Sequence, residues 1–198
     1  MIAVSTSFAT KPHDDVRTQR NVSWEAFASF LVERGDGMPR VAYLEGTLET
    51  MSPSRNHELL RNALRASVEA HLDHLGARYA NVGSWLLKSA PHEAGLEPDD
   101  CFLLDNLGKD RPDLALEVVW TSGSISKLEI YRRLGVPEVW IWRDEAISVH
   151  VLGEDSHYSR RDQSALLPAF DFVLALQMMT FEALSDVKLA LRRHYDAG

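Results

Sequence analysis

Residues 96–142 read LEPDDCFLLDNLGKDRPDLALEVVWTSGSISKLEIYRRLGVPEVWIW, and this stretch decides the fold of the chain. Two short apolar runs, each introduced by Pro-Asp, are followed by an amphipathic segment and then by a third apolar run. This order is typical of strand, strand, helix, strand.

Two carboxylates stand among the apolar neighbours of these strands. Asp99 opens the first strand and Glu117 lies inside the second, LALEV. Side chains alternate along a strand, so Glu117 shares one face with Asp113 and Ala115. Burying an ionised carboxylate is costly unless it is paired or binds a metal. Two of them on adjacent strands predict a divalent-cation site, the alternative being a Glu at a strand edge paired with an arginine.

The segments before this stretch predict a helix, a hairpin and a longer helix. Residues 1–21 are polar and without periodicity, which predicts a flexible arm. Ser23 is the expected N-cap of the first helix, and Glu45-Gly46 suits the turn of the hairpin. The second helix is expected over residues 55–75, with His57 on its inward face.

The segments after Trp142 predict a hairpin, a further edge strand and a C-terminal helix capped by Thr180. The element order predicts an α/β (α+β) fold with a central mixed sheet flanked by helices. The N-terminal helix and hairpin and the C-terminal hairpin and helix are additions to this core. Trp140 and Trp142 share a strand face and could serve the core, an interface or base stacking.

Composition narrows the class of protein. The 198 residues predict one domain, 1–198, and a formal charge of −8 counts against broad electrostatic binding of nucleic acid. The single cysteine, Cys101, lies in an apolar run and is expected in the core. The start of the chain does not resemble a signal peptide and no apolar run is long enough to span a bilayer, so a cytoplasmic protein without membrane contact is expected.

The arrangement resembles the PD-(D/E)XK nuclease superfamily, and within it a bacterial restriction-endonuclease-like branch. The resemblance rests on MSPSRNH, EPD, PDLALEVV and KLEIYRRLGVPEVWIW and covers about residues 43–151. It implies a restriction-endonuclease-like core that cuts DNA with Mg²⁺, for which Mn²⁺ can substitute. Because duplex half-sites are commonly matched by a two-fold dimer, a homodimer is also expected.

The resemblance implies catalytic roles for particular residues. It makes Asp99 and Glu117 the metal ligands, His57 the inward residue of the first core helix, and Glu45 the acidic residue of the preceding hairpin. The chain departs from the pattern two residues beyond Glu117, where Val119 replaces the catalytic lysine. Two lysines could take its place. They are Lys127, at the start of the next helix, and Lys88.

Each of these residues also has a structural interpretation. Lys127 could lie on a solvated helix face, His57 could be a hydrogen-bonded core histidine, and Glu45 could be an ordinary turn residue. Three functions therefore stay open. They are a Mg²⁺-dependent endonuclease acting on DNA, an inactive nuclease-fold module for binding or assembly, and a metal-independent hydrolase using His57.

Overall fold

A computed structural model of the protein describes residues 13–121 and 123–196, in which the strands form two sheets. The five-stranded sheet has the order β1-β3-β2-β6-β5, with strands Asp15–Arg20 (β1), Thr47–Ser52 (β3), Arg40–Leu44 (β2), Ala94–Leu96 (β6) and Leu87–Ser89 (β5). The six-stranded sheet has the order β11-β10-β9-β8-β7-β4, with strands Tyr158–Arg161 (β11), Ala146–Leu152 (β10), Glu138–Arg143 (β9), Leu114–Val118 (β8), Asp100–Leu104 (β7) and Tyr79–Asn81 (β4). The helices are Trp24–Arg34 (α1), Arg55–His74 (α2), Lys127–Leu134 (α3), Phe172–Met178 (α4) and Leu184–Asp196 (α5), with a 3₁₀ turn at Ala90–His92.

The predicted strand, strand, helix, strand unit is confirmed as β7, β8, α3 and β9. β7 pairs with β8 antiparallel, whereas β8 pairs with β9 parallel. A parallel pair needs a crossover connection, and α3 provides it. The six-stranded sheet is therefore mixed, as expected.

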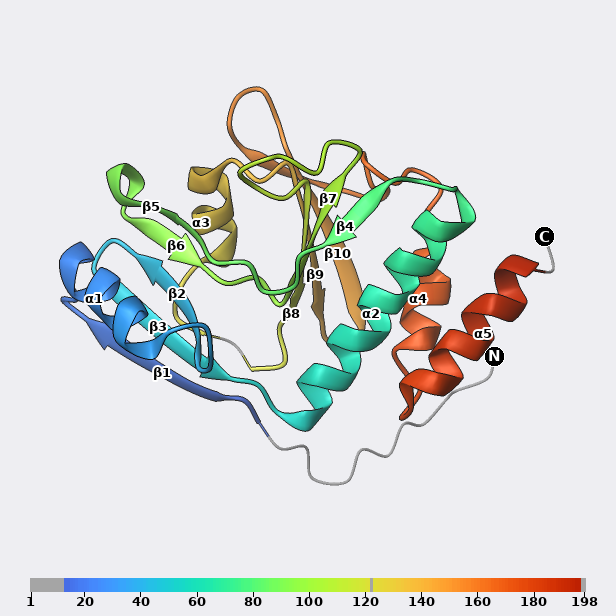
Figure 1. The fold of residues 1–198 in the computed structure, drawn as a ribbon, viewed down its shortest axis with the longest axis horizontal. Helices are drawn as coiled ribbons and strands as arrows, with labels where there is room; N and C mark the ends of the chain where they lie inside the picture. Colours follow the sequence, from blue (N-terminus) through green and yellow to red (C-terminus); the bar gives the residue numbers. More distant parts are fainter. Residues whose placement is uncertain (1–12, 122, 197–198) are drawn as a thin grey trace.

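Alternation along β8 sorts its side chains between two cores. Leu114, Leu116 and Val118 face the core that contains α2, α4 and α5. Ala115 belongs to the opposite core, which contains side chains of α3 and of the five-stranded sheet. Figure 1 shows this layering, with α2, α4 and α5 on one side of the six-stranded sheet and α3 on the other. Glu117 shares the face of Ala115, and it therefore points into the space between the two sheets.

Several local predictions are confirmed. The Ser23 hydroxyl accepts a hydrogen bond from the backbone N–H of Ala26 and caps α1. Trp140 and Trp142 are buried in the core, and so is Cys101. Burial raises the pKa of the Cys101 thiol to about 12, which is the behaviour of an inert core residue.

Other predictions are wrong. Residues 15–20 of the expected arm form β1, which pairs antiparallel with β3; residues 1–12 lie outside the described part. Most side chains of β1 are exposed. An edge strand of this kind lacks the alternation of apolar residues by which a strand is recognised in a sequence. Thr180 does not cap the last helix, which begins at Leu184, because its hydroxyl bonds back to the carbonyl of Gln177.

Across residues 13–121 and 123–196, no helix has both the length and the apolar character needed to cross a bilayer.

Candidate active site

Asp99 lies at the centre of a buried polar cluster. Its side chain is fully buried immediately before β7, and Arg40 of β2 donates a hydrogen bond to its Oδ1. The backbone N–H of Val118 donates to Oδ2 at 2.7 Å. Burial raises the pKa of Asp99, but the charges of Lys127, His57 and Arg40 outweigh burial and hold the pKa well below its usual range. Asp99 therefore stays ionised.

Glu117 is the second buried carboxylate, and α3 supplies both of its partners. The Lys127 Nζ lies 2.5 Å from Oε2, and the Tyr131 hydroxyl donates to Oε1. Burial and the nearby charge of Asp99 raise the pKa of Glu117, which makes Glu117 the more readily protonated of the two carboxylates. Environments that push two carboxylate pKa values apart are typical of acid–base sites.

Lys127 occupies the first turn of α3, where Ser126 is the N-cap. A cation at a helix N-terminus is disfavoured by the helix dipole, so helix stability does not explain this lysine. The carboxylates of Glu117 and Asp99 raise the pKa of Lys127 in spite of its burial. Lys127 is thus held protonated against Glu117, and the interpretation of a solvated helix face is not supported.

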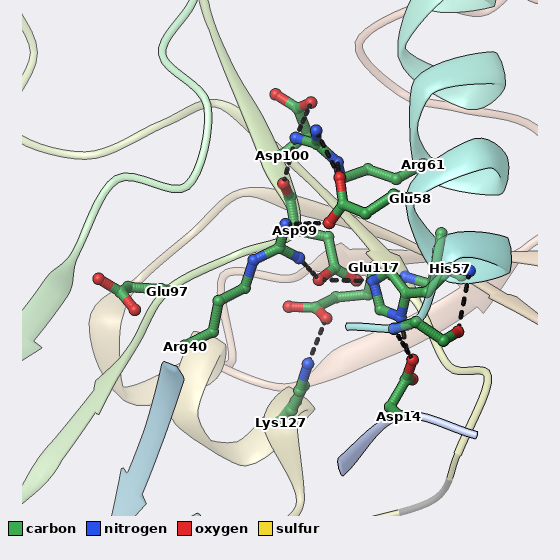
Figure 2. Close-up of polar contacts among 12 residues, drawn as sticks. Asp14, Arg40, His57, Glu58, Arg61, Glu97, Asp99, Asp100, Glu117 and Lys127 are labelled. Atoms are coloured by element: carbon green, nitrogen blue, oxygen red, sulfur yellow. Dashed lines mark hydrogen bonds and ion pairs between the residues drawn. The ribbon is translucent and has the colours of Figure 1, made fainter. Parts of the chain in front are cut away.

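His57 connects Asp99 to the N-terminal segment (Figure 2). Its Nε2 lies 3.0 Å from Asp99 Oδ1 and its Nδ1 lies 3.0 Å from Asp14 Oδ2. Asp14 also accepts the backbone N–H of Ser54, the N-cap of α2, at 2.7 Å. Both ring nitrogens face carboxylates and neither faces a nucleophile, so the geometry does not favour a hydrolase that uses His57 as its base.

The pKa of His57 makes stability depend on pH. Burial lowers this pKa, but the Asp14 and Asp99 carboxylates more than offset it and raise the value to about 9. A folded pKa above the unfolded value of about 6.5 gives stability that is complete below pH 6.5 and is lost as the pH rises through 9. We expect a loss on the order of 3 kcal/mol across this window in urea unfolding of the parent protein.

The His57→Gln variant should lack this loss, while a His74→Gln control, changed at an exposed site on the same helix, should keep it. Equal slopes of stability against pH in the parent and in His57→Gln would show that the imidazole is not charged in the folded protein.

A cavity of about 520 Å³ opens beside the cluster. Its walls include Asp14, Glu49, His57, Glu117 and Lys127. Asp99 is fully buried behind them. A bound group in this cavity could therefore reach Lys127 directly, whereas its access to Glu117 and Asp99, which are both 0% exposed, needs a displacement of the surrounding side chains.

Comparison with known families identifies the chain. Residues 24–180 match the model of Uma2, described as "Putative restriction endonuclease". The chain belongs to the Uma2 family. Uma2 is part of the PD-(D/E)XK nuclease superfamily, so the resemblance to this superfamily and the restriction-endonuclease-like α+β fold are confirmed. No curated protein matches the chain.

The superfamily of Uma2 generally uses divalent metals, and the residues of this Uma2 protein fit such an ion in their chemistry. Asp99 and Glu117 offer the carboxylate oxygens that Mg²⁺ prefers. Within the described residues, however, no group of three or more His, Cys, Asp or Glu side chains is placed to hold an ion. Lys127, Arg40 and His57 balance the carboxylate charges instead. An ion would share or take over oxygens that these cations now contact.

Four of the five residues predicted for the Uma2 site come together, and one does not. Asp99, Glu117, Lys127 and His57 form the cluster (Figure 2). Glu45 lies outside it, at the tip of the β2–β3 turn with a φ of 44°, and its carboxylate pairs with Arg133. The expectation that Glu45 belongs to the site is therefore corrected, because the tight turn directs its side chain elsewhere.

The structure of this Uma2 protein distinguishes between Lys127 and Lys88, the two lysines that could replace the one missing at Val119. Val119 lines the cavity but supplies only apolar surface. Lys88 is exposed on β5 and forms no ion pair with the residues at 13–121 and 123–196. Lys127 is therefore the lysine that reaches the carboxylates, from the helix after the strand rather than from the strand itself.

Sequence reasoning missed three charged residues of this candidate site. Arg40 and Asp14 contact Asp99 and His57 from distant segments. Glu49 lines the cavity, where it accepts the backbone N–H of Ser124 at 2.7 Å. A Cβ at Gly123 would collide with the Glu49 carboxylate, so a side chain there would displace this carboxylate from its contact with Ser124. The isolated Glu in LETM was the available signal for Glu49.

Proposed function

We propose that this Uma2-family protein is a Mg²⁺-dependent endonuclease that hydrolyses phosphodiester bonds of DNA. The observation that carries the proposal is the contact of Lys127 Nζ with Glu117 Oε2 at 2.5 Å on the cavity wall, in a chain whose strand position holds Val119. This contact supports Lys127 as the counterpart of the lysine that the superfamily pattern has on the strand.

The residues of the cluster have different roles in the proposed hydrolysis of a phosphodiester bond. Asp99 and Glu117 would hold the cation, which when bound polarises a phosphoryl oxygen and lowers the pKa of the attacking water. The Lys127 ammonium can donate to a phosphate oxygen and stabilise the charge that develops there in the transition state. Arg40 and His57 keep Asp99 ionised and fix its orientation.

Cleavage of supercoiled plasmid DNA tests this function. The parent protein should nick the plasmid in Mg²⁺ or Mn²⁺ and not in EDTA. The Asp99→Asn, Glu117→Gln double variant should lose the activity, while Glu182→Gln, at an exposed site, should keep it. Cleavage that persists in the double variant would contradict the assigned roles.

An inactive binding module is the second candidate function, and one observation favours it. Every oxygen of Asp99 and Glu117 is already contacted by a protein donor. A protein of this kind would hold its charge balance without an ion and would cut none of the substrates tested. The homodimer and the cytoplasmic location stay predictions.

A further inference from the structure

The face of the six-stranded sheet that carries Glu117 continues past the active site onto β9, β10 and β11. Glu117 is in register with Ile141 of β9, and Ile141 is in register with Ser148 of β10. His150, two residues further along β10, is in register with Arg160 of β11. Figure 1 shows β8, β9 and β10 side by side.

Four polar side chains of this face line the same cavity as Glu117 and Lys127. They are Arg143, Ser148, His150 and Arg160, hereafter called the basic track. The charge of Arg160 contributes to a lowered pKa of His150, after the larger effect of burial, so these two side chains lie near each other. The cavity therefore has the Glu117 carboxylate on β8 and, further along the same face, the arginines of β9 and β11.

The arginines of the basic track are available to a ligand. Arg143 and Arg160 are exposed, and neither forms an ion pair with any residue of 13–121 or 123–196. One carboxylate, Asp144, stands beside Arg143 on the cavity wall without pairing with it. Other arginines of the chain, such as Arg132 and Arg133, are bound to Glu129. The track is thus a local cationic surface on a chain of net charge −8.

Strand spacing gives the distance over which the basic track would act. Adjacent strands lie about 4.8 Å apart, so β11 lies roughly 14 Å from β8. In duplex DNA a strand advances about 3.4 Å per nucleotide along the helix axis, so this distance corresponds to roughly four nucleotides of a duplex. Guanidinium groups suit phosphate oxygens because they can donate two parallel hydrogen bonds.

We propose that the basic track binds the phosphodiester backbone of a nucleic-acid strand a few nucleotides from the position that faces Glu117 and Lys127. Arg160 and Arg143 contact the phosphates, and Ser148 and His150 are within the same wall. This inference rests on the proposed function for the position of the cut bond, but binding itself requires neither a metal nor cleavage. The track supplies the local attraction that the acidic chain as a whole lacks.

Fluorescence anisotropy in EDTA tests the proposal. The probes are a labelled 20-base-pair duplex DNA and single-stranded DNA and RNA of the same sequence, each titrated at several salt concentrations. The Arg143→Gln, Arg160→Gln variant should bind the preferred probe about 10- to 100-fold more weakly, and its slope of log affinity against log salt should fall by roughly 2.

A matched control removes the same charge from the other side of the molecule. Arg161 follows Arg160 on β11 and points to the opposite face, and Arg193 is exposed on α5. The Arg161→Gln, Arg193→Gln variant should bind within about twofold of the parent. Because all four positions are exposed, unfolding curves of both variants should match that of the parent.

Equal losses of affinity in the two variants would overturn the basic track, and so would a parent protein that binds none of the three probes at low salt. Either result could be obtained with a protein that binds metal normally, so failure of this inference is distinguishable from failure of the proposed function. Conversely, a selective loss in the track variant, with no metal binding or cleavage by the parent, would leave the track in place and support the inactive binding module.

Discussion

Replacing Lys127 with Met should lower the rate of DNA cleavage by about two to three orders of magnitude, the usual loss when one donor to a developing oxyanion is removed. Lys127 Nζ lies against Glu117 on the cavity wall, and among the described residues Lys127 is the one lysine that lines the cavity. Single-turnover cleavage of plasmid DNA at saturating Mg²⁺ measures this loss.

A measurement of Mn²⁺ affinity distinguishes a role of Lys127 in stabilising the transition state from a role in holding the ion. Because the Lys127 ammonium competes for Glu117 Oε2, its removal should leave Mn²⁺ affinity unchanged or stronger. Lys88→Met, an exposed lysine on β5, is the matched control and should cut at the parent rate. A Lys127→Met protein that cleaves like the control would contradict the assignment.

Replacing Arg40 with Met should lower the free energy of unfolding by about 3–5 kcal/mol, because it leaves the buried Asp99 charge without its guanidinium. The Asp99 side chain is 0% exposed and that of Arg40 only 9%. Arg40 also pairs with Glu58 at 2.7 Å, so two contacts are lost together. Urea unfolding at pH 7 measures the change.

The same experiment has an internal check. Adding Asp99→Asn to Arg40→Met should recover part of the lost stability, since the uncompensated charge is then gone. Arg17→Met removes an ion pair that is open to solvent on both sides and should leave the unfolding midpoint unchanged. If Arg40→Met costs no more than Arg17→Met, the buried network does not contribute as described.

The central part of the fold was predictable because each element there has its own local pattern. The apolar runs of β7, β8 and β9 and the capped amphipathic α2 placed Asp99, Glu117 and His57 on the correct elements. Lys127 was one of the two lysines considered as a replacement for the strand lysine, and its side chain contacts Glu117, as does that of Tyr131.

The rest of the site depends on pairing between segments far apart in the chain. Asp14 reaches His57 because β1 pairs with β3, and β1 is a mostly exposed strand with no apolar alternation. Arg40 reaches Asp99 because the five-stranded sheet packs against the other sheet. Two members of the five-stranded sheet, β5 and β6, have three residues each, too few to show a period.

The most direct test of the account is a calorimetric Mn²⁺ titration of the parent protein beside the Asp99→Asn, Glu117→Gln variant. Asp100→Asn is the matched control, because Asp100 is equally buried next to Asp99 but pairs with Arg61 instead. The account predicts binding by the parent and by Asp100→Asn and none by the double variant. Absence of binding by the parent, or unchanged binding by the double variant, would contradict a metal site between these two strands.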